Sequence, residues 1–90
     1  MNWDDLKVLL ALSSEGSTRK AGFALGVSNT TVMRRLESLE EQIGGRLFDR
    51  TPDGFRATSL ADQLLPTARD VEEMLAEAER QVSGKDSELS

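Results

Sequence analysis

Three glycines divide the first half of the chain into short segments, and their spacing restricts the fold more than any other feature of the sequence. Gly16, Gly26 and Gly44 each follow a segment whose apolar residues recur at helical spacing. Glycine commonly stands just past a helix C-terminus, because it adopts a left-handed backbone conformation without strain. This half therefore predicts three short helices, and a chain of 90 residues leaves room for one small domain around them.

Each predicted helix also begins at a residue that commonly caps a helix N-terminus. Asn2, Ser17 and Ser28 stand at the three starts, where a side-chain oxygen accepts a hydrogen bond from a free backbone N–H group. The second and third helices are expected at about 18–25 and 28–43, which is the pattern of a helix-turn-helix. The residues expected to face the core are Trp3, Leu6, Leu9, Leu10 and Leu12, then Ala21, Ala24 and Leu25, then Val32, Leu36, Leu39 and Ile43.

A Pro-Asp-Gly turn follows these helices at residues 52–54. Proline fixes the φ angle at the start of such a turn, and glycine permits a positive φ at its end. Short, partly alternating segments flank the turn, so residues 46–58 predict a β-hairpin, here called the wing. Phe48 and Phe55 are expected to fasten the wing to the helices.

The second half of the chain predicts one long helix, which Thr58 or Ser59 caps and which ends at about Val82. Its apolar residues recur in alternating steps of four and three, the seam spacing of a coiled coil. The first turns, through about Leu65, are expected to pack on the chain's own core. The rest outruns so small a core, so we expect a homodimer, parallel or antiparallel, through this stripe. The expected dimer-interface residues are Leu64, Ala68, Val71, Leu75, Ala78 and Val82.

The formal net charge of −5 is unevenly distributed along the chain. Residues 17–36 hold four cations and no acid, whereas residues 59–90 hold eight acids and three cations. An overall negative charge argues against a nucleic-acid ligand, because the phosphate backbone is itself negative. The basic middle of the chain argues for one, since a dimer through the long helix holds the acids away from the duplex.

The residue types that many enzymes and metal sites require are missing. The sequence has no Cys, His or Tyr, which excludes a disulfide scaffold, a Cys/His metal site and histidine acid–base catalysis. We therefore expect no enzyme activity, no cofactor and no metal. No apolar run approaches the roughly 20 residues of a membrane span, and the acidic start is unlike a signal peptide. We therefore expect a cytoplasmic protein that has no membrane partner.

The outward face of the third helix carries the best candidates for contact with DNA. Asn29, Thr30 and Arg34 lie in its first turns, and a recognition helix places such side chains at base edges in the major groove. Ser17 and Ser28 stand at helix starts, where N–H groups and the helix dipole favour a phosphate. The alternative is that all of these are ordinary solvent-facing residues on capped helices.

The wing adds two arginines, Arg50 and Arg56, which are expected to reach the DNA backbone or the minor groove. The alternative for both is a solubilising role on the surface. The full set of candidate DNA-binding residues is Ser17, Thr18, Ser28, Asn29, Thr30, Thr31, Met33, Arg34, Arg50 and Arg56.

Together these residues resemble the N-terminal DNA-binding domain of LysR-type transcriptional regulators. The similarity covers about residues 1–82, and the run from Leu36 to Thr51 is its most specific part. The matching stretches are Gly16-Ser17, Ala21, Leu25 to Ser28, Arg34, Leu36 to Gly44, Leu47 to Thr51, Arg56 to Thr58, and Leu64 to Arg69.

The resemblance implies a mainly α fold. A winged helix-turn-helix of three helices and a short β-hairpin is expected at residues 1–58, then a linker helix at 59–82 and a flexible tail at 83–90. The implied function is sequence-specific binding of double-stranded DNA by a homodimer, with the helix at 28–43 in the major groove and the wing at 46–58 on the backbone or minor groove. Full-length members are often tetramers and sense a small-molecule effector through a further domain that is absent here.

Not every position fits the family pattern equally well. Ser28, Arg34 and Arg50 match it by residue type. Asn29 and Thr30 match by location only, because the family commonly has Gln-Pro there. This departure is expected to alter the sequence preference.

Two further departures are expected to weaken contact with the DNA backbone. Met33 stands where the family commonly has serine, and Asp53 stands at the wing tip, where a basic residue is usual. With the net charge of −5, they motivate an alternative: a winged-helix protein–protein or dimerisation module that has lost DNA binding. A molybdate-responsive winged-helix regulator shares the fold and the linker helix, but the run from Arg34 to Ile43 fits the LysR-type pattern better.

Overall fold

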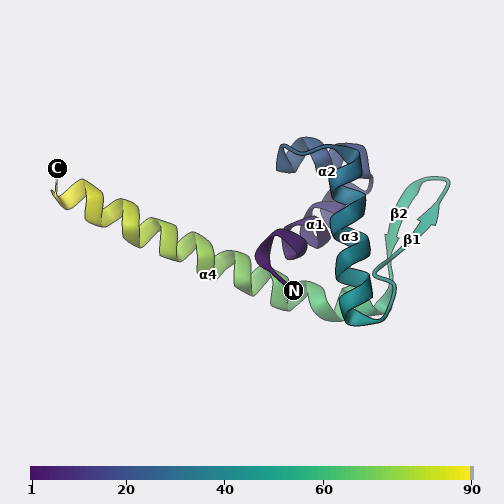
Figure 1. Cartoon of the computed structure of the whole chain (residues 1–90). Coiled ribbons are helices and arrows are strands. Elements are labelled where there is room, and N and C mark those ends of the chain that lie inside the picture. The colour runs from purple at the N-terminus through teal and green to yellow at the C-terminus, as the bar shows by residue number, and fades with distance from the viewer. Residues whose placement is uncertain (90) are drawn as a thin grey trace.

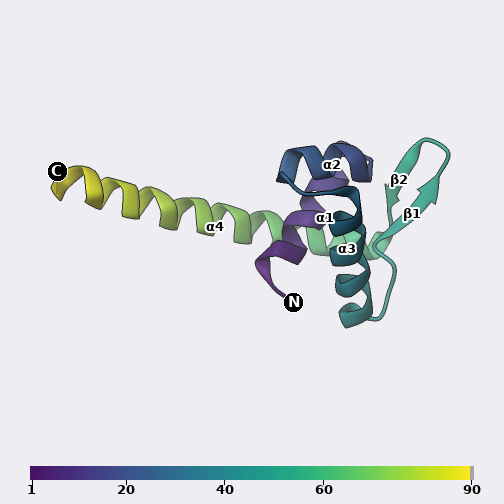
Figure 2. The same ribbon diagram turned by 45° about the horizontal axis from the view of Figure 1, so that its top comes forward.

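The computed structural model describes the backbone of residues 1–89 and the side-chain surroundings of residues 1–84. Three short helices form a head, a two-stranded hairpin lies beside it, and most of the last helix extends away from both (Figures 1 and 2). This architecture confirms the predicted winged helix-turn-helix followed by a long helix. The elements in chain order are α1 (Trp3–Glu15), α2 (Thr18–Leu25), α3 (Asn29–Ile43), β1 (Phe48–Thr51), β2 (Gly54–Ala57) and α4 (Ser59–Leu89).

The predicted helix boundaries in the head are confirmed by their capping hydrogen bonds. Asn2 Oδ1 accepts from the N–H of Asp5 at 3.0 Å, and Ser17 Oγ accepts from the N–H of Lys20 at 3.2 Å. Ser28 caps α3 in the same way. The three glycines at the helix C-termini have the left-handed φ that the sequence indicated, 80° at Gly16, 70° at Gly26 and 79° at Gly44.

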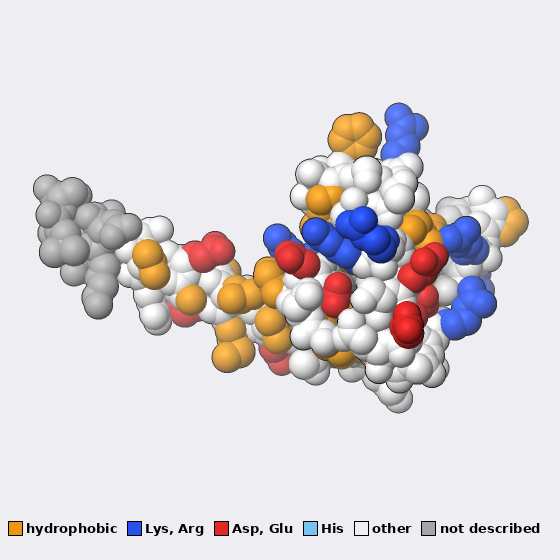
Figure 3. Space-filling model, in the orientation of Figure 1, with side chains coloured by type: hydrophobic (Ala, Val, Ile, Leu, Met, Phe, Trp, Pro, Cys, Tyr) orange, Lys and Arg blue, Asp and Glu red, His pale blue; other side chains and the backbone are white. Residues whose placement is uncertain are grey.

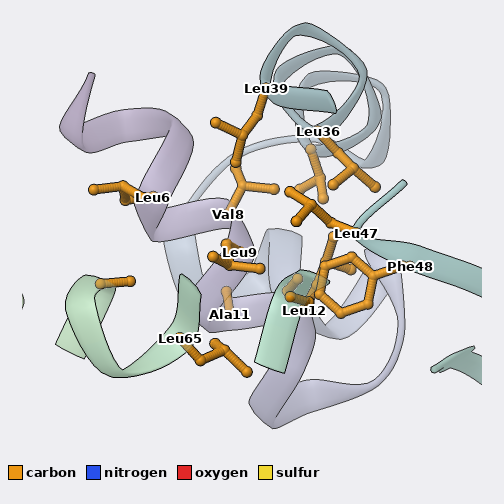
Figure 4. Packing of buried hydrophobic residues seen from close by; sticks show 14 residues of the cluster. Leu6, Val8, Leu9, Ala11, Leu12, Leu36, Leu39, Leu47, Phe48 and Leu65 are labelled. Carbon is orange, nitrogen blue, oxygen red and sulfur yellow. The ribbon is translucent and has the colours of Figure 1, made fainter. Parts of the chain in front are cut away.

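The core lies where α1, α3, β1 and the first turns of α4 meet (Figure 4). Leu9, Leu12, Leu39 and Leu47 are fully buried there, and burial of such side chains is the main source of stability for the head. α4 contributes three buried residues, Ala61, Leu65 and Ala68. The head is therefore closed by the start of α4 and does not end at residue 58 as a packing unit.

The inward face of α2 differs from the prediction at one residue. Ala21 is buried and Leu25 is half-buried, as expected, but Ala24 is exposed. The buried neighbour is instead Gly22, where an added Cβ would lie 2.7 Å from the carbonyl oxygen of Val27. The missing side chain lets α2 lie directly against the turn before α3.

The wing is an antiparallel hairpin in which Phe48 pairs with Ala57 and Thr51 pairs with Gly54. The N–H of Phe55 donates to the carbonyl oxygen of Gly16 at 3.0 Å, which ties the hairpin to the turn between α1 and α2. Gly54 has a φ of 128°, and a Cβ there would collide with the same carbonyl oxygen. β2 is therefore held against the turn between α1 and α2 at Gly54 and Phe55.

Two phenylalanines fasten the hairpin, as predicted. Phe48 is buried in the core, and Phe55 is half-buried against it. Their rings meet edge to face, with centroids 6.2 Å apart and an interplanar angle of 79°, an arrangement that aromatic pairs favour.

Thr58 caps α4, as one of the two expected residues. Its Oγ1 accepts from the N–H of Ala61 at 3.3 Å and donates to the carbonyl oxygen of Arg46 at 2.7 Å. The helix then continues to Leu89, so the expected end at about Val82 is wrong. The helix includes most of the segment expected as a tail at 83–90, and Ser90 lies outside the described part of the chain. Within that part of the chain, no helix combines the length and apolar character needed to cross a membrane.

Candidate nucleic-acid interface

α3 presents the predicted polar face to solvent because its apolar face is fixed in the core. Val32, Leu36 and Leu39 are buried, and Ile43 is half-buried. The opposite side of the helix is exposed, and its residues include Asn29, Thr30, Arg34 and Glu37. The first turns of α3 therefore present the amide group of Asn29 and the guanidinium of Arg34 to solvent, where a ligand can contact them.

The hydroxyl groups at the start of α3 pair with each other. Ser28 Oγ accepts from the N–H of Thr31 at 3.1 Å and donates to Thr31 Oγ1 at 3.0 Å. Thr31 is half-buried and Ser28 is exposed. The Thr31 hydroxyl keeps its own hydrogen as a donor, and the backbone N–H groups of Asn29 and Thr30 have no partner within the helix.

Ser17 and Thr18 occupy the corresponding place at the start of α2. Both are half-buried, and the Ser17 hydroxyl accepts the capping hydrogen bond described above. Arg19 and Lys20 follow on the exposed side of the helix. This N-terminus therefore combines free N–H groups with two cations, which suits an anion.

A depression of about 300 Å³ lies between α2 and the start of α3. Asn29 reaches into it, because its Oδ1 lies 3.6 Å from the point where a Cβ on Gly22 would stand. Phe23 forms one wall and is 80% exposed. Sequence analysis missed Phe23, since a helix of two turns does not fix its own inward face. The depression is lined by Arg19, Gly22, Phe23, Gly26, Val27, Ser28 and Asn29.

The hairpin register separates the two arginines of the wing. Arg50 pairs with Phe55 across the strands, and Arg56 pairs with Asp49. Alternate residues of a strand point to opposite faces, so Arg50 shares the face of the buried Phe48, toward the head. Arg56 lies on the outer face opposite an acid. The sequence gives no reason to distinguish the two arginines, but in the fold Arg50 contacts a residue of α3.

That link is a direct contact with Met33, which is half-buried on α3. Arg50 Nη2 donates to Met33 Sδ at 3.6 Å, and the guanidinium carbon lies 5.6 Å from the centroid of the Phe55 ring. The structure therefore brings together two candidate residues that the sequence placed on different elements.

Charge is distributed in space as it is along the chain. Lys and Arg side chains lie over the head and the wing, with acidic side chains among them on the head, while apolar and acidic side chains follow the extended helix (Figure 3). In residues 1–84, ion pairs join only Arg46 to Asp49 and Arg80 to Glu77 and Glu73. Hydrogen bonds from Arg80 to these glutamates raise the pKa of its guanidinium. The cations of α2 and α3 thus remain available to a ligand.

The predicted dimer stripe on α4 divides into two parts. Ala68 is fully buried by its own chain, so its assignment to the interface is wrong: it belongs to the core. Leu64 and Val71 are half-buried against that core. Leu75 is 37% exposed and Val82 is 62% exposed, and with Ala78 they line an open groove on the outer part of the helix.

A model of the bacterial regulatory helix-turn-helix proteins of the LysR family matches residues 3–62. The chain belongs to the LysR family. The transcriptional regulator YofA of Bacillus subtilis is 38% identical over 80 residues, which are 89% of this chain and 28% of YofA. The lysine export regulator LysG of Corynebacterium glutamicum is 35% identical over 89 residues, 99% of this chain and 30% of LysG. The chain thus spans less than a third of these curated relatives.

Solved structures of LysR-family proteins share the fold. The DNA-binding domain of CbnR, in a complex with DNA, has a TM-score of 0.83 and 25% identity, and the match covers 94% of this chain and 98% of that domain. Full-length LysG of C. glutamicum with bound effector Arg also has a TM-score of 0.83, with 35% identity over 94% of this chain and 29% of LysG. The family match covers α1, α2, α3, the wing and the start of α4.

Proposed function

We propose that this LysR-family chain is a dimeric, sequence-specific module for binding double-stranded DNA in a bacterial transcriptional regulator that works in the cytoplasm. α3 enters the major groove with its first turns, and the wing lies on the backbone or in the minor groove. The module binds and does not catalyse. The observation that carries the proposal is the exposed basic and amide face of α3 beside free helix N-termini, in a fold shared with the DNA-bound domain of CbnR.

The chain divides by role as well as by packing. Residues 1–58 supply the DNA-binding surface, and α4 from residue 59 onward supplies the dimer contact. The outer stripe of Leu75, Ala78 and Val82 supports this assignment, because an apolar stripe with an exposed seam is stable in water only with a partner. A two-fold dimer presents two copies of α3 to a two-fold DNA site.

In a full-length regulator, the same dimer would combine into a tetramer, and a small-molecule effector would bind a domain outside residues 1–90. Full-length LysG with bound effector Arg supports the effector part of this proposal by analogy. The alternative of a protein–protein module without DNA binding has less support, since the chain belongs to the LysR family and shares its fold with the DNA-bound domain of CbnR.

Substitution of Arg34 tests the assignment of α3 as the recognition helix. Arg34→Ala removes the side chain best suited to a bidentate contact with guanine, so we expect a loss of roughly 1–3 kcal/mol and a relaxed specificity at one position. The measurement is fluorescence anisotropy on a duplex that the unaltered protein selects from a random pool.

Arg80→Ala is the matched control, because Arg80 is an exposed arginine on α4 that lies far from α3 along the fold. It is expected to leave binding unchanged. Equal affinities for Arg34→Ala and the unaltered chain would remove Arg34 from the interface. A tight dimer that binds no duplex even at low salt would instead establish the protein–protein alternative.

A further inference from the structure

Met33 and Arg50 meet between α3 and the wing, although 17 positions separate them in the sequence. Arg50 Nη2 donates to Met33 Sδ at 3.6 Å, and the same guanidinium lies over the Phe55 ring at 5.6 Å. Phe55 is in turn packed on the buried Phe48. Arg50 is therefore held from two sides by groups that belong to the packed framework of the head.

Both partners of this arginine are neutral, which sets it apart from other arginines of the chain. A thioether is a weak, uncharged acceptor, and an aromatic face attracts a cation without cancelling its charge. Arg46 and Arg80, by contrast, lie within 4.0 Å of carboxylates. Among residues 1–84, no carboxylate lies that close to Arg50. Arg50 is thus oriented while it keeps its charge and four of its five N–H donors.

We propose that Met33 is a positioning residue for DNA binding: it holds the Arg50 guanidinium against Phe55 so that the free N–H groups face a backbone phosphate between α3 and the wing. The inference rests on the proposed function and adds a role that the local sequence does not indicate. A long arginine side chain loses much rotamer freedom on binding, and prior contacts reduce the freedom left to lose. Met33 thus contributes through Arg50, without touching the DNA.

The first test uses the free protein and does not depend on DNA. Met33→Leu keeps the size of the side chain and removes the sulfur acceptor, and Met74→Leu makes the same change at a residue of α4 that is 71% exposed. We expect NMR relaxation to show a lower order parameter for the Arg50 Nε–H group in Met33→Leu, with a weaker ring-current shift from Phe55. Met74→Leu is expected to change neither. Unchanged Arg50 signals in Met33→Leu would overturn the proposal.

The second test is a double-mutant cycle with Arg50→Ala, measured as affinity for the selected duplex. We expect Met33→Leu to weaken binding about threefold, the scale of one weak contact to a charged donor, and to have no further effect once Arg50 is alanine. Equal losses in both backgrounds would mean that Met33 contacts the DNA itself and would overturn the positioning role. If the unaltered chain binds no duplex, the proposed function fails, and the NMR result still decides whether Met33 orders Arg50.

Discussion

The head and the outer half of α4 are both built from amphipathic helices, but they differ in what covers their apolar residues. In the head, three helices, the hairpin and the start of α4 bury most of one another's leucines, and Leu9, Leu12, Leu39 and Leu47 completely. Between Val71 and Gly84, Met74, Leu75 and Val82 are exposed, and the charged side chains around them are mainly acidic. The difference is the reason for the proposal that the outer part of α4 packs against a second chain, while the head is stabilised by its own core.

The two regions also differ in charge. Residues 1–58 hold eight acids and eight cations, whereas residues 59–90 hold eight acids and three cations. The basic segment at 17–36 forms α2, the turn and most of α3, and the acidic segment begins with α4. α4 extends away from the head in both views of the fold (Figures 1 and 2). A net negative chain can therefore present a positive surface, since charges more than a Debye length away, about 8–10 Å, are largely screened.

The largest effect is expected from a substitution in the core of the head. Leu39→Ala empties a fully buried position of α3 and should lower the free energy of unfolding by about 2–5 kcal/mol, because it leaves a cavity in the core. Thermal unfolding followed by circular dichroism measures the change. Val82→Ala on the exposed stripe serves as the comparison at concentrations where the chain is monomeric. A similar loss in both variants would contradict the division between head and outer helix.

The next largest effect is expected from a substitution in the exposed apolar stripe of α4. Leu75→Glu places a charge in the exposed stripe, so we expect monomers in sedimentation and a loss of duplex affinity of about 100-fold, because two linked modules bind more tightly than one. Gln81→Glu adds the same charge to an exposed position of α4 outside the stripe and is expected to leave the dimer intact. If Leu75→Glu keeps the mass and the affinity of the unaltered chain, the stripe is not the interface.

The smallest effect is expected from a charge change at the tip of the wing, compared with the same change on α4. Asp53→Lys turns the exposed wing tip from an acid into a base, and we expect about threefold tighter binding with one more phosphate neutralised in the salt dependence. Asp70→Lys makes the same charge change on α4. A gain that is equal in the two variants would show that net charge, and not the position of the wing, governs binding.

Features set by neighbouring residues could be predicted from the sequence. Asn2, Ser17 and Ser28 cap their helices, and the glycines end them, because capping depends on a few adjacent residues. The hairpin at 46–58 follows from its turn in the same way. The end of α4 could not be predicted, since each residue added to an existing helix costs little and no proline stops it after Val82.

Features set by distant residues could not be predicted. The spacing of Ala68 shows that it lies on an apolar stripe, but it does not show whether its own chain or a second one covers it. The contact of Met33 with Arg50 depends on where the hairpin lies against α3, which in turn depends on the packing of Phe55 beside Gly16. The register that separates Arg50 from Arg56 is likewise a property of the folded hairpin.

The most direct test of the account is the salt dependence of binding to a random-sequence duplex, measured by fluorescence anisotropy with residues 1–90. The account predicts binding at low salt that weakens on a log–log slope of about −3 or steeper, because the head and wing neutralise several phosphates. Absence of binding at low salt, or a slope near zero, would contradict it and would show that the acidic residues of the chain outweigh the basic segment at 17–36.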